Sequence, residues 1–181
     1  MANSALVTTG KPKIGGAVYR APLGTTLPTD TTTALDNAFI DVGYISEDGV
    51  TANISRESED IKDWGGTVLT TTQTSKTDTI NFTMVEALNV EALKVVHGDA
   101  NVTGTLSTGI TVTENATELD AHAWVVDMVN LDGTAHRLVY PSAKVSEIEE
   151  IVYNATDPVG YGVTLSAMPD ASGNTHYEYF K

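Results

Sequence analysis

The sequence predicts a mainly β protein, a β-sandwich or barrel with one short flanking α-helix and a long N-terminal arm or loop. Three features predict it: short stretches in which apolar and polar residues alternate, Asp-Gly pairs between such stretches, and a Pro/Thr-rich segment near the start. The chain has 181 residues, of which 41% are hydrophobic and 19% charged. This length and composition are typical of one folded domain with its own core, so we expect residues 1–181 to form a single domain.

The predicted arm or loop covers about residues 10–36. Its central part, Pro22 to Thr33 (PLGTTLPTDTTT), contains proline, glycine and threonine with almost no large apolar residue. This composition favours an extended arm or a long loop over a regular element. A loop of this length in a compact domain is usually functional, disordered or packed against another chain.

Two Asp-Gly pairs predict β-hairpins, because glycine adopts the positive φ that a tight primed turn requires. They are Asp48-Gly49 and Asp132-Gly133, each between two stretches of alternating character. A third hairpin is predicted around the polar segment 169–174. The paired strands are expected at 39–45 with 50–54, at 124–131 with 136–140, and at 161–167 with 176–180.

The clearest single strand is predicted over residues 79–85, where apolar and polar side chains alternate strictly. The apolar positions are Ile80, Phe82 and Met84, and the polar positions are Thr79, Asn81 and Thr83. A strand of this kind has one face on a core and the other in water, so the polar face suits a wet channel or an outer wall.

One helix is predicted over residues 90–96, which place apolar side chains at helical spacing. Asn89 has a side chain suited to cap the first turn, and Gly98 stands where such a helix would end. Because the helix is short, packing rather than intrinsic propensity must stabilise it.

The charge of the chain is strongly acidic, with 24 Asp and Glu residues against 10 Lys and Arg, a net charge of −14. Such a surface repels phosphate backbones, which argues against a protein that grips DNA or anionic lipid. No cysteine is present, so disulfides and thiolate chemistry are excluded. The N-terminus lacks the pattern of a secretory signal and no apolar stretch approaches the ~20 residues that span a bilayer, so we expect synthesis in the cytoplasm and no membrane association.

A search for catalytic, metal-binding and cofactor-binding patterns leads to the prediction that the protein has none of these sites and is not an enzyme. The four histidines are far apart in the sequence, and the runs of acidic residues are typical of solvent-exposed faces. No glycine-rich phosphate loop or nucleophile elbow occurs. The alternative from the enzyme class is a small β-barrel hydrolase that uses Asp120, His122 and a remote carboxylate.

The segment from Gly43 to Gly66 resembles the major tail proteins of siphophages. The resemblance is carried by GYISEDGV at 43–50, Arg56-Glu57-Ser58, and DIKDWGG at 60–66. It continues through the strand at 79–85, the helix at 90–96 and the stretch Gly16 to Pro22 (GAVYRAP). From Asn101 onward only the architecture matches, without a diagnostic motif.

The resemblance implies a structural virion protein that self-assembles into stacked hexameric rings. The stack would form the tail tube, a β-lined conduit through which double-stranded DNA passes during ejection without specific binding. The implied partners are further copies of the chain, the tape measure protein and the tail-tip and terminator proteins, and the implied location is the virion tail after synthesis in the host cytoplasm. No cofactor is implied. An acidic wall fits such a channel, because each lysine or arginine facing the lumen would bind DNA through counterion release. The predicted arm would then order by packing on a neighbouring subunit.

Two regions are candidates for assembly. The predicted ring-stacking loop consists of Glu47, Asp48, Glu57, Glu59, Asp60, Asp63 and Trp64. The predicted polar lumen or wall strand consists of Thr79, Asn81 and Thr83. Trp64 has an alternative interpretation as a cap on the sandwich core.

The acidic side chains of the loop need cations on the next ring, because like charges facing each other would oppose stacking. Candidate cations are Arg20, Lys62, Lys76 and Lys144.

Two other structural interpretations share the strands, turns and acidity. One is an Ig-like or lectin-like β-sandwich that acts as a binding or decoration module, and it would be monomeric or form small oligomers. The other is the inner tube of a contractile injection system, which shares the ring fold and differs in its partner sheath.

Overall fold

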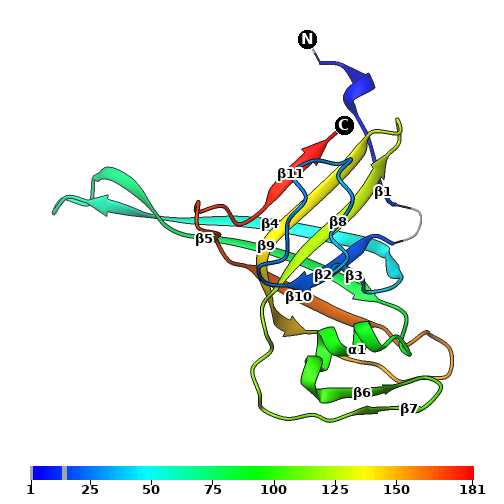
Figure 1. The fold of residues 1–181 in the computed structure, drawn as a ribbon. Helices are drawn as coiled ribbons and strands as arrows, with labels where there is room; N and C mark the ends of the chain where they lie inside the picture. Colours follow the sequence, from blue (N-terminus) through cyan, green and yellow to red (C-terminus); the bar gives the residue numbers. More distant parts are fainter. Residues whose placement is uncertain (1, 14–15) are drawn as a thin grey trace.

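The computed structural model describes residues 2–13 and 16–181 and confirms a mainly β fold with one short α-helix (Figure 1). The helix is α1 (Val90–His97), and the described residues also contain two short 3-10 turns, Ser4–Leu6 and Asp99–Asn101. The strands are β1 (Gly10–Pro12), β2 (Val18–Pro22), β3 (Ile40–Asp41), β4 (Ile45–Lys62), β5 (Val68–Met84), β6 (Val102–Thr105), β7 (Gly109–Val112), β8 (His122–Asn130), β9 (Ala135–Ile148), β10 (Tyr161–Ala167) and β11 (Tyr177–Phe180).

Nine of these strands form one antiparallel sheet in the order β3-β2-β8-β9-β10-β5-β4, with β1 added to β8 and β11 added to β9. The sheet folds over itself. β9 and β10 separate β8 from β5 in the sheet, yet the rings of Trp124 on β8 and Phe82 on β5 lie 6.0 Å apart between centroids. The two ends of the sheet therefore enclose a common core, as expected for a sandwich or an open barrel.

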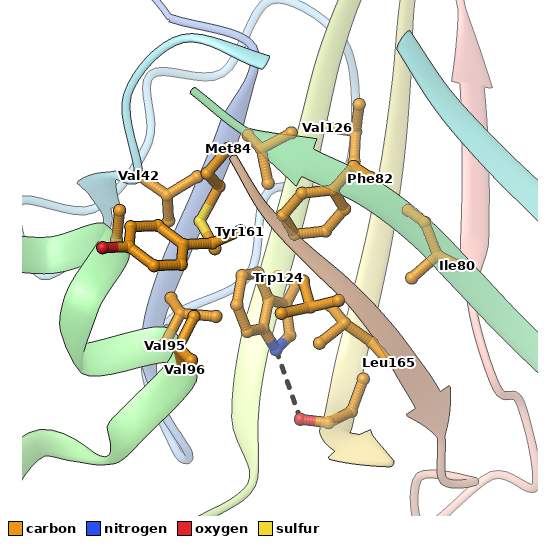
Figure 2. Packing of buried hydrophobic residues seen from close by; sticks show 14 of the residues in the cluster. Val42, Ile80, Phe82, Met84, Val95, Val96, Trp124, Val126, Tyr161 and Leu165 are labelled. Carbon is orange, nitrogen blue, oxygen red and sulfur yellow. Dashed lines mark hydrogen bonds between the residues drawn. The ribbon is translucent and has the colours of Figure 1, made fainter. Parts of the chain in front are cut away.

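The main core lies inside this fold, where strands from both ends of the sheet meet (Figure 2). Trp124 is 2% exposed, and its indole nitrogen donates a hydrogen bond of 3.2 Å to the carbonyl of Ala143. Ile80, Phe82 and Met84 are buried in it, so the predicted alternation of β5 is confirmed. Burial of large aromatic and aliphatic side chains of this kind contributes about 1.5–3 kcal/mol each.

Helix α1 covers one end of this core, beside the small β6–β7 hairpin (Figure 1). The Asn89 side chain accepts a hydrogen bond from the Glu91 amide, and Gly98 follows the last turn with a φ of 92°. The predicted helix and both of its caps are confirmed. Its buried face consists of Ala92, Leu93, Val95 and Val96.

A smaller core lies on the other face of the sheet and is covered by the loop that follows β2. Phe39 is buried there against Val125 and Val139, and the loop residues Leu27 and Leu35 pack on the same cluster. The structure therefore does not confirm an N-terminal arm. The long loop packs on the sheet of its own chain, because its apolar residues Leu27 and Leu35 contact the smaller core. The loop is therefore ordered without a neighbouring subunit.

A buried ion pair ties the same loop to the sheet. Arg137 on β9 and Asp127 on β8 form a bidentate contact, with nitrogen–oxygen distances of 2.5 and 2.8 Å. The guanidinium also donates to the carbonyls of Asp30 and Thr33, at 2.9 and 2.8 Å. Both charges are thus satisfied within the chain, which is the condition under which a buried ion pair is tolerated.

The predicted pairing of strands is right in one of three cases. The turn at Asp132-Gly133 joins β8 to β9 as expected. By contrast, Asp48-Gly49 lies in an irregularity of the single strand β4, between Ile45 and Val50, so the predicted hairpin at that position is wrong. The predicted C-terminal hairpin is also wrong, because β10 pairs with β5 and β9 while β11 pairs with the other end of β9.

Candidate assembly surface

A long β-hairpin formed by β4 and β5 projects from the body of the molecule (Figure 1). From residue 51 to residue 77 every residue except Ser75 is exposed, whereas Asp78, the next residue on β5, is buried. The register runs from Ile54 opposite Asp78 to Lys62 opposite Val68. At about 3.4 Å per residue the projection reaches on the order of 30 Å beyond the core.

The tip of the hairpin is a tight polar turn. The Asp63 amide donates to the Thr67 carbonyl at 2.9 Å, and the Asp63 carboxylate accepts from the Thr67 amide at 2.7 Å. Gly66 has a φ of 86°, which a residue with a Cβ rarely adopts. The turn therefore holds Trp64 at the extreme end of the hairpin.

Trp64 is fully exposed, and the interpretation of this residue as a cap on the core is wrong. Four further large apolar side chains on the hairpin are also exposed: Ile61, Val68 and Leu69 near the turn, and Ile54 at the base. Exposed apolar residues that gather at one place mark sites of interaction with other proteins. An isolated two-stranded hairpin is at best marginally stable in water, so this projection needs a partner surface.

The acidic residues predicted to form one loop are divided between two places. Glu57, Glu59 and Asp60 lie on the hairpin strand β4, and Asp63 lies in its turn beside Trp64. Glu47 and Asp48 lie in the irregular start of β4, at the other end of that strand. Within one chain the structure therefore does not bring the predicted set together.

The base of the hairpin is fixed by a polar cluster that the sequence did not reveal. Asp78 is 1% exposed, and its Oδ2 accepts a hydrogen bond from the Thr175 hydroxyl and lies 2.5 Å from Nδ1 of His176. Lys76 donates to the same threonine at 2.8 Å. Burial, with the nearby charge of Asp78, raises the pKa of the buried Tyr140, so its hydroxyl stays neutral. The loop before β11 thus anchors β5 where the strand leaves the body.

The three polar residues predicted to face a lumen or wall lie on the outer face of β5, opposite the core. Asn81 is exposed, and Thr79 and Thr83 are half-buried. Hydroxyl and amide side chains continue across this face on the neighbouring strands, since Asn81 pairs with Thr51 on β4 and with Thr164 on β10. The result is a polar wall formed by three adjacent strands.

Three of the four cations proposed as partners of the hairpin are already paired within the chain. Arg20 is buried and contacts Glu91 and Asp99, at 3.0 and 2.6 Å. Lys76 lies 3.9 Å from Asp78, and Lys144 contacts Glu118. The fourth, Lys62, lies on the hairpin itself. Among the described residues, Lys62 is the one of these four cations for which no ion pair is found.

The contacts of Arg20 belong to a network that attaches helix α1 to β2 and β8. Burial alone would raise the pKa of Asp99, but the hydrogen bond and charge of Arg20 outweigh it and lower the pKa. The pKa of Glu91 is lowered in the same way, with Lys94 adding a hydrogen bond. Nε2 of His122 lies 3.2 Å from Asp99, and its Nδ1 faces the backbone carbonyl of Asp120. His122, one residue of the hydrolase alternative, therefore belongs to the network that attaches the helix, and Asp120 contacts it through its backbone carbonyl.

Among the described residues the structure has neither a cluster of metal-ligand side chains nor a membrane-spanning helix. Within ranges 2–13 and 16–181, no group of three or more His, Asp or Glu side chains converges as metal ligands do. The eight-residue α1 is the longest helix in those ranges, and none there is long and apolar enough to cross a bilayer.

The described residues thus form a β-rich protein with one folded antiparallel sheet and an anchored, exposed hairpin. The chain belongs to the phage tail tube protein family, since the family model described as phage tail tube protein matches residues 2–180. Solved structures with the same fold include the cap that terminates the tube of the anti-feeding prophage. That similarity has a TM-score of 0.51 with 10% identity and covers 100% of each chain. No curated protein matches significantly.

Proposed function

We propose that the protein is the subunit of a phage tail tube, which assembles as hexameric rings that stack through the projecting hairpin. The tube is the conduit for DNA ejection and lies in the virion tail. Its partners are other copies of the chain, the tape measure protein, and the tail-tip and terminator proteins. The family match supports the tube, and the exposed hairpin supports stacking.

The hairpin is the single observation that carries this proposal. A hairpin with one exposed tryptophan and four other exposed large apolar residues is unfavourable on a solitary soluble protein. In a stack, the same side chains are buried at the next ring, and this burial contributes to assembly instead of to folding. An Ig-like or lectin-like decoration module has no need for such a projection, and the family match does not favour it.

The polar wall of β4, β5 and β10 is the proposed lining of the channel. Its central residues Thr79, Asn81 and Thr83 carry no charge, so they offer DNA no site for counterion release. Lys144 stands near this face on β9, but its ammonium group is engaged with Glu118. Together with the net charge of −14, this composition lets DNA slide without binding.

A cap or terminator of a tube is a second candidate function, favoured by the full-length structural similarity to the tube-terminating cap of the anti-feeding prophage. A cap would form one ring and stop, whereas a tube subunit would continue to polymerise. The inner tube of a contractile system is distinguished from both by binding of an outer sheath.

Negative-stain electron microscopy of the purified chain across concentration, with light scattering on the same samples, tests the proposal. Hollow tubes that lengthen with concentration are the expected result. Single rings at every concentration would favour the cap. Monomers at all concentrations, even after tail-tip components are added as initiators, would contradict both.

A further inference from the structure

Positive and negative charges are separated along the sequence. Residues 1–29 contain two lysines and one arginine but no Asp or Glu, whereas residues 145–180 contain six Asp and Glu but no Lys or Arg. In the structure the N-terminal segment lies at one end of the body, and the β9–β10 loop, drawn in orange, lies at the other (Figure 1). The two ends therefore present side chains of opposite charge.

The first of these ends carries a surface that we call the terminal surface. It consists of Leu6, Val7, Lys11, Leu131 and Lys181, all of them exposed. Lys11 is paired with Val129, Val129 is paired with Ala135, and Ala135 exchanges backbone hydrogen bonds with Lys181. Because directly paired residues in an antiparallel sheet point to the same face, the two lysines lie in one row across four strands.

The lysines of the terminal surface have no partner charge in the chain. Within ranges 2–13 and 16–181, Lys11 and Lys181 take part in no ion pair. On β8, Asp127 is already paired with Arg137, and in the turn after β8 the Asp132 carboxylate accepts two hydrogen bonds. The two lysines therefore remain available to acidic groups of a partner.

Exposed aliphatic side chains adjoin these lysines. Leu6 and Val7 are 80% and 77% exposed, and Leu131 is exposed at the end of β8. The Leu131 amide donates a hydrogen bond of 3.0 Å to the Thr8 hydroxyl, which places the N-terminal segment beside the end of that strand. The terminal surface thus combines apolar and cationic side chains.

The opposite end carries a second surface that we call the loop surface. It lies in and beside the β9–β10 loop and consists of Leu88, Glu149, Glu150, Val152 and Tyr153, all of them exposed. Tyr153 is 75% exposed and lies near Tyr161, whose pKa is raised by burial and, to a smaller extent, by Tyr153. The Tyr161 hydroxyl donates to the carbonyl of Ala87, the neighbour of Leu88. Neither glutamate takes part in an ion pair among the described residues, so this surface suits a partner with apolar and cationic side chains.

We propose that the terminal surface of one copy docks on the loop surface of the next copy around a ring. The two free lysines of one surface face the two glutamates of the other, and Leu6 and Val7 cover the ring of Tyr153. One chain cannot close this contact by itself. The terminal surface adjoins the start of β9 and the loop surface follows its end, and the 14 residues of this strand span on the order of 40 Å.

The inference rests on the proposed function and identifies the contact that closes the ring. In Figure 1 the hairpin projects across the line from the termini to the β9–β10 loop. When the hairpin reaches the next ring, both surfaces can therefore face neighbours in their own ring. Two different surfaces that meet head to tail give a ring when the rotation between copies closes. The contact also neutralises lysines that would bind DNA if they faced the channel.

Charge reversal combined with mixing tests the contact. The terminal variant carries Lys11→Glu with Lys181→Glu, and the loop variant carries Glu149→Lys with Glu150→Lys. Alone, each variant has like charges on both surfaces, so its critical concentration for assembly should rise at least about tenfold. In an equal mixture, every contact between unlike variants again joins opposite charges, so alternating rings and tubes should form.

A control with matched charge replaces the loop variant by Glu59→Lys with Asp60→Lys, which makes the same change of net charge on the hairpin. The terminal variant carries an affinity tag, and its incorporation into sedimented assemblies is measured. It should enter assemblies with the loop variant and stay out of those formed with the control. Urea denaturation checks first that each variant keeps the transition midpoint of the wild type.

Several outcomes would overturn the proposed contact. Normal assembly of either variant alone, no recovery in the mixture, or equal incorporation with the control would exclude this contact and leave the tube proposal intact. Single rings of a variant that fail to stack would place the contact between rings and not within one. Failure of the wild-type chain to assemble under every condition would instead overturn the proposed function and this inference with it.

Discussion

The two tryptophans of the chain occupy opposite environments. Trp124 lies in the middle of the body, 2% exposed, with its indole nitrogen hydrogen-bonded to a carbonyl. Trp64 lies at the end of the hairpin, fully exposed. Both are large aromatic side chains that would gain free energy from burial, but only one of them obtains it within the monomer. The difference shows that this sequence contains two sets of apolar residues, one for folding and one for contact with other chains.

The body and the hairpin differ in polar chemistry as well. In the body, buried charges such as Arg137 and Asp127 are fully paired within the chain. On the hairpin, the acidic residues from Glu57 to Asp63 have hydrogen-bond partners at most, and no ion pair among the described residues. Substitutions in the body should therefore change folding stability, and substitutions on the hairpin should change assembly.

The largest expected effect on folding is that of Trp124→Ala. Removing this side chain leaves a cavity between β5, β8 and β10 and should lower the free energy of unfolding by about 3–5 kcal/mol. Urea denaturation followed by far-UV circular dichroism measures it. A loss below about 1 kcal/mol would mean that the two ends of the sheet do not close over this residue as described.

Arg137→Met should lower the free energy of unfolding by at least about 3 kcal/mol, because it leaves Asp127 buried without its partner. The second substitution Asp127→Leu, added to the first, removes the orphaned charge. Recovery of much of the lost stability in the double variant is the expected outcome of the same denaturation experiment. If the double variant were less stable than the single one, the buried charge would not be the cause.

Asp78→Asn tests whether the base of the hairpin controls its position. The amide keeps a hydrogen-bond acceptor for Thr175 but loses the charge that faces His176 and Lys76, and we expect a cost of about 1–3 kcal/mol. Amide hydrogen exchange should become faster along residues 51–77 than in β8 and β9. Equal acceleration everywhere would show that Asp78 stabilises the whole fold and not the hairpin in particular.

Acid should weaken the attachment of helix α1. The pKa values of Asp99 and Glu91 are lowered in the folded chain, so the unfolded chain binds more protons as the pH falls. Their contribution is complete above the ordinary carboxylate range of about pH 4 and is lost as the pH falls through the lowered values. Asp99→Asn should cost about 1 kcal/mol at neutral pH, since the group is partly exposed. The difference from wild type should shrink toward acid, and a constant difference would contradict the proposed linkage.

Trp64→Ala has the smallest expected effect on folding and the clearest one on assembly. Because the side chain contacts no core, the free energy of unfolding should stay within about 0.5 kcal/mol of wild type. The critical concentration for tube formation should rise at least tenfold, since loss of a buried aromatic anchor costs about 2 kcal/mol or more at an interface. A large fall in stability with unchanged polymerisation would reverse the roles assigned to the two tryptophans.

The sequence predicted local structure well because local patterns determine it. The alternation of 79–85 predicted the inner and outer faces of β5, and Asn89 and Gly98 correctly marked the ends of the helix. The turn at Asp132-Gly133 was predicted for the same reason. By contrast, Asp48-Gly49 forms an irregularity within one strand, because the strand continues far past it along a partner that no local signal identifies.

The features that sequence analysis missed depend on residues far apart in the chain. Asp78 and His176 meet across 98 positions, and no spacing rule relates them. The sequence around Trp64 is acidic, and such a sequence is compatible both with the edge of a core and with a projecting tip. The position of Trp64 therefore could not be predicted from it. The segment 68–77 is rich in threonine, and its apolar residues do not form one face that could pack on the body. The segment is exposed for this reason.

Acrylamide quenching of tryptophan fluorescence, measured on the free subunit and on assembled tubes of the same protein, tests the central claim most directly. If the hairpin tip is buried between subunits, the free subunit should contain one readily quenched tryptophan, and that tryptophan should become protected after assembly. The readily quenched signal should be absent from the Trp64→Phe variant. Trp124 should be protected in both states. If Trp64 were quenched as readily in tubes as in the free subunit, the hairpin tip would not be buried between subunits and the account would be wrong.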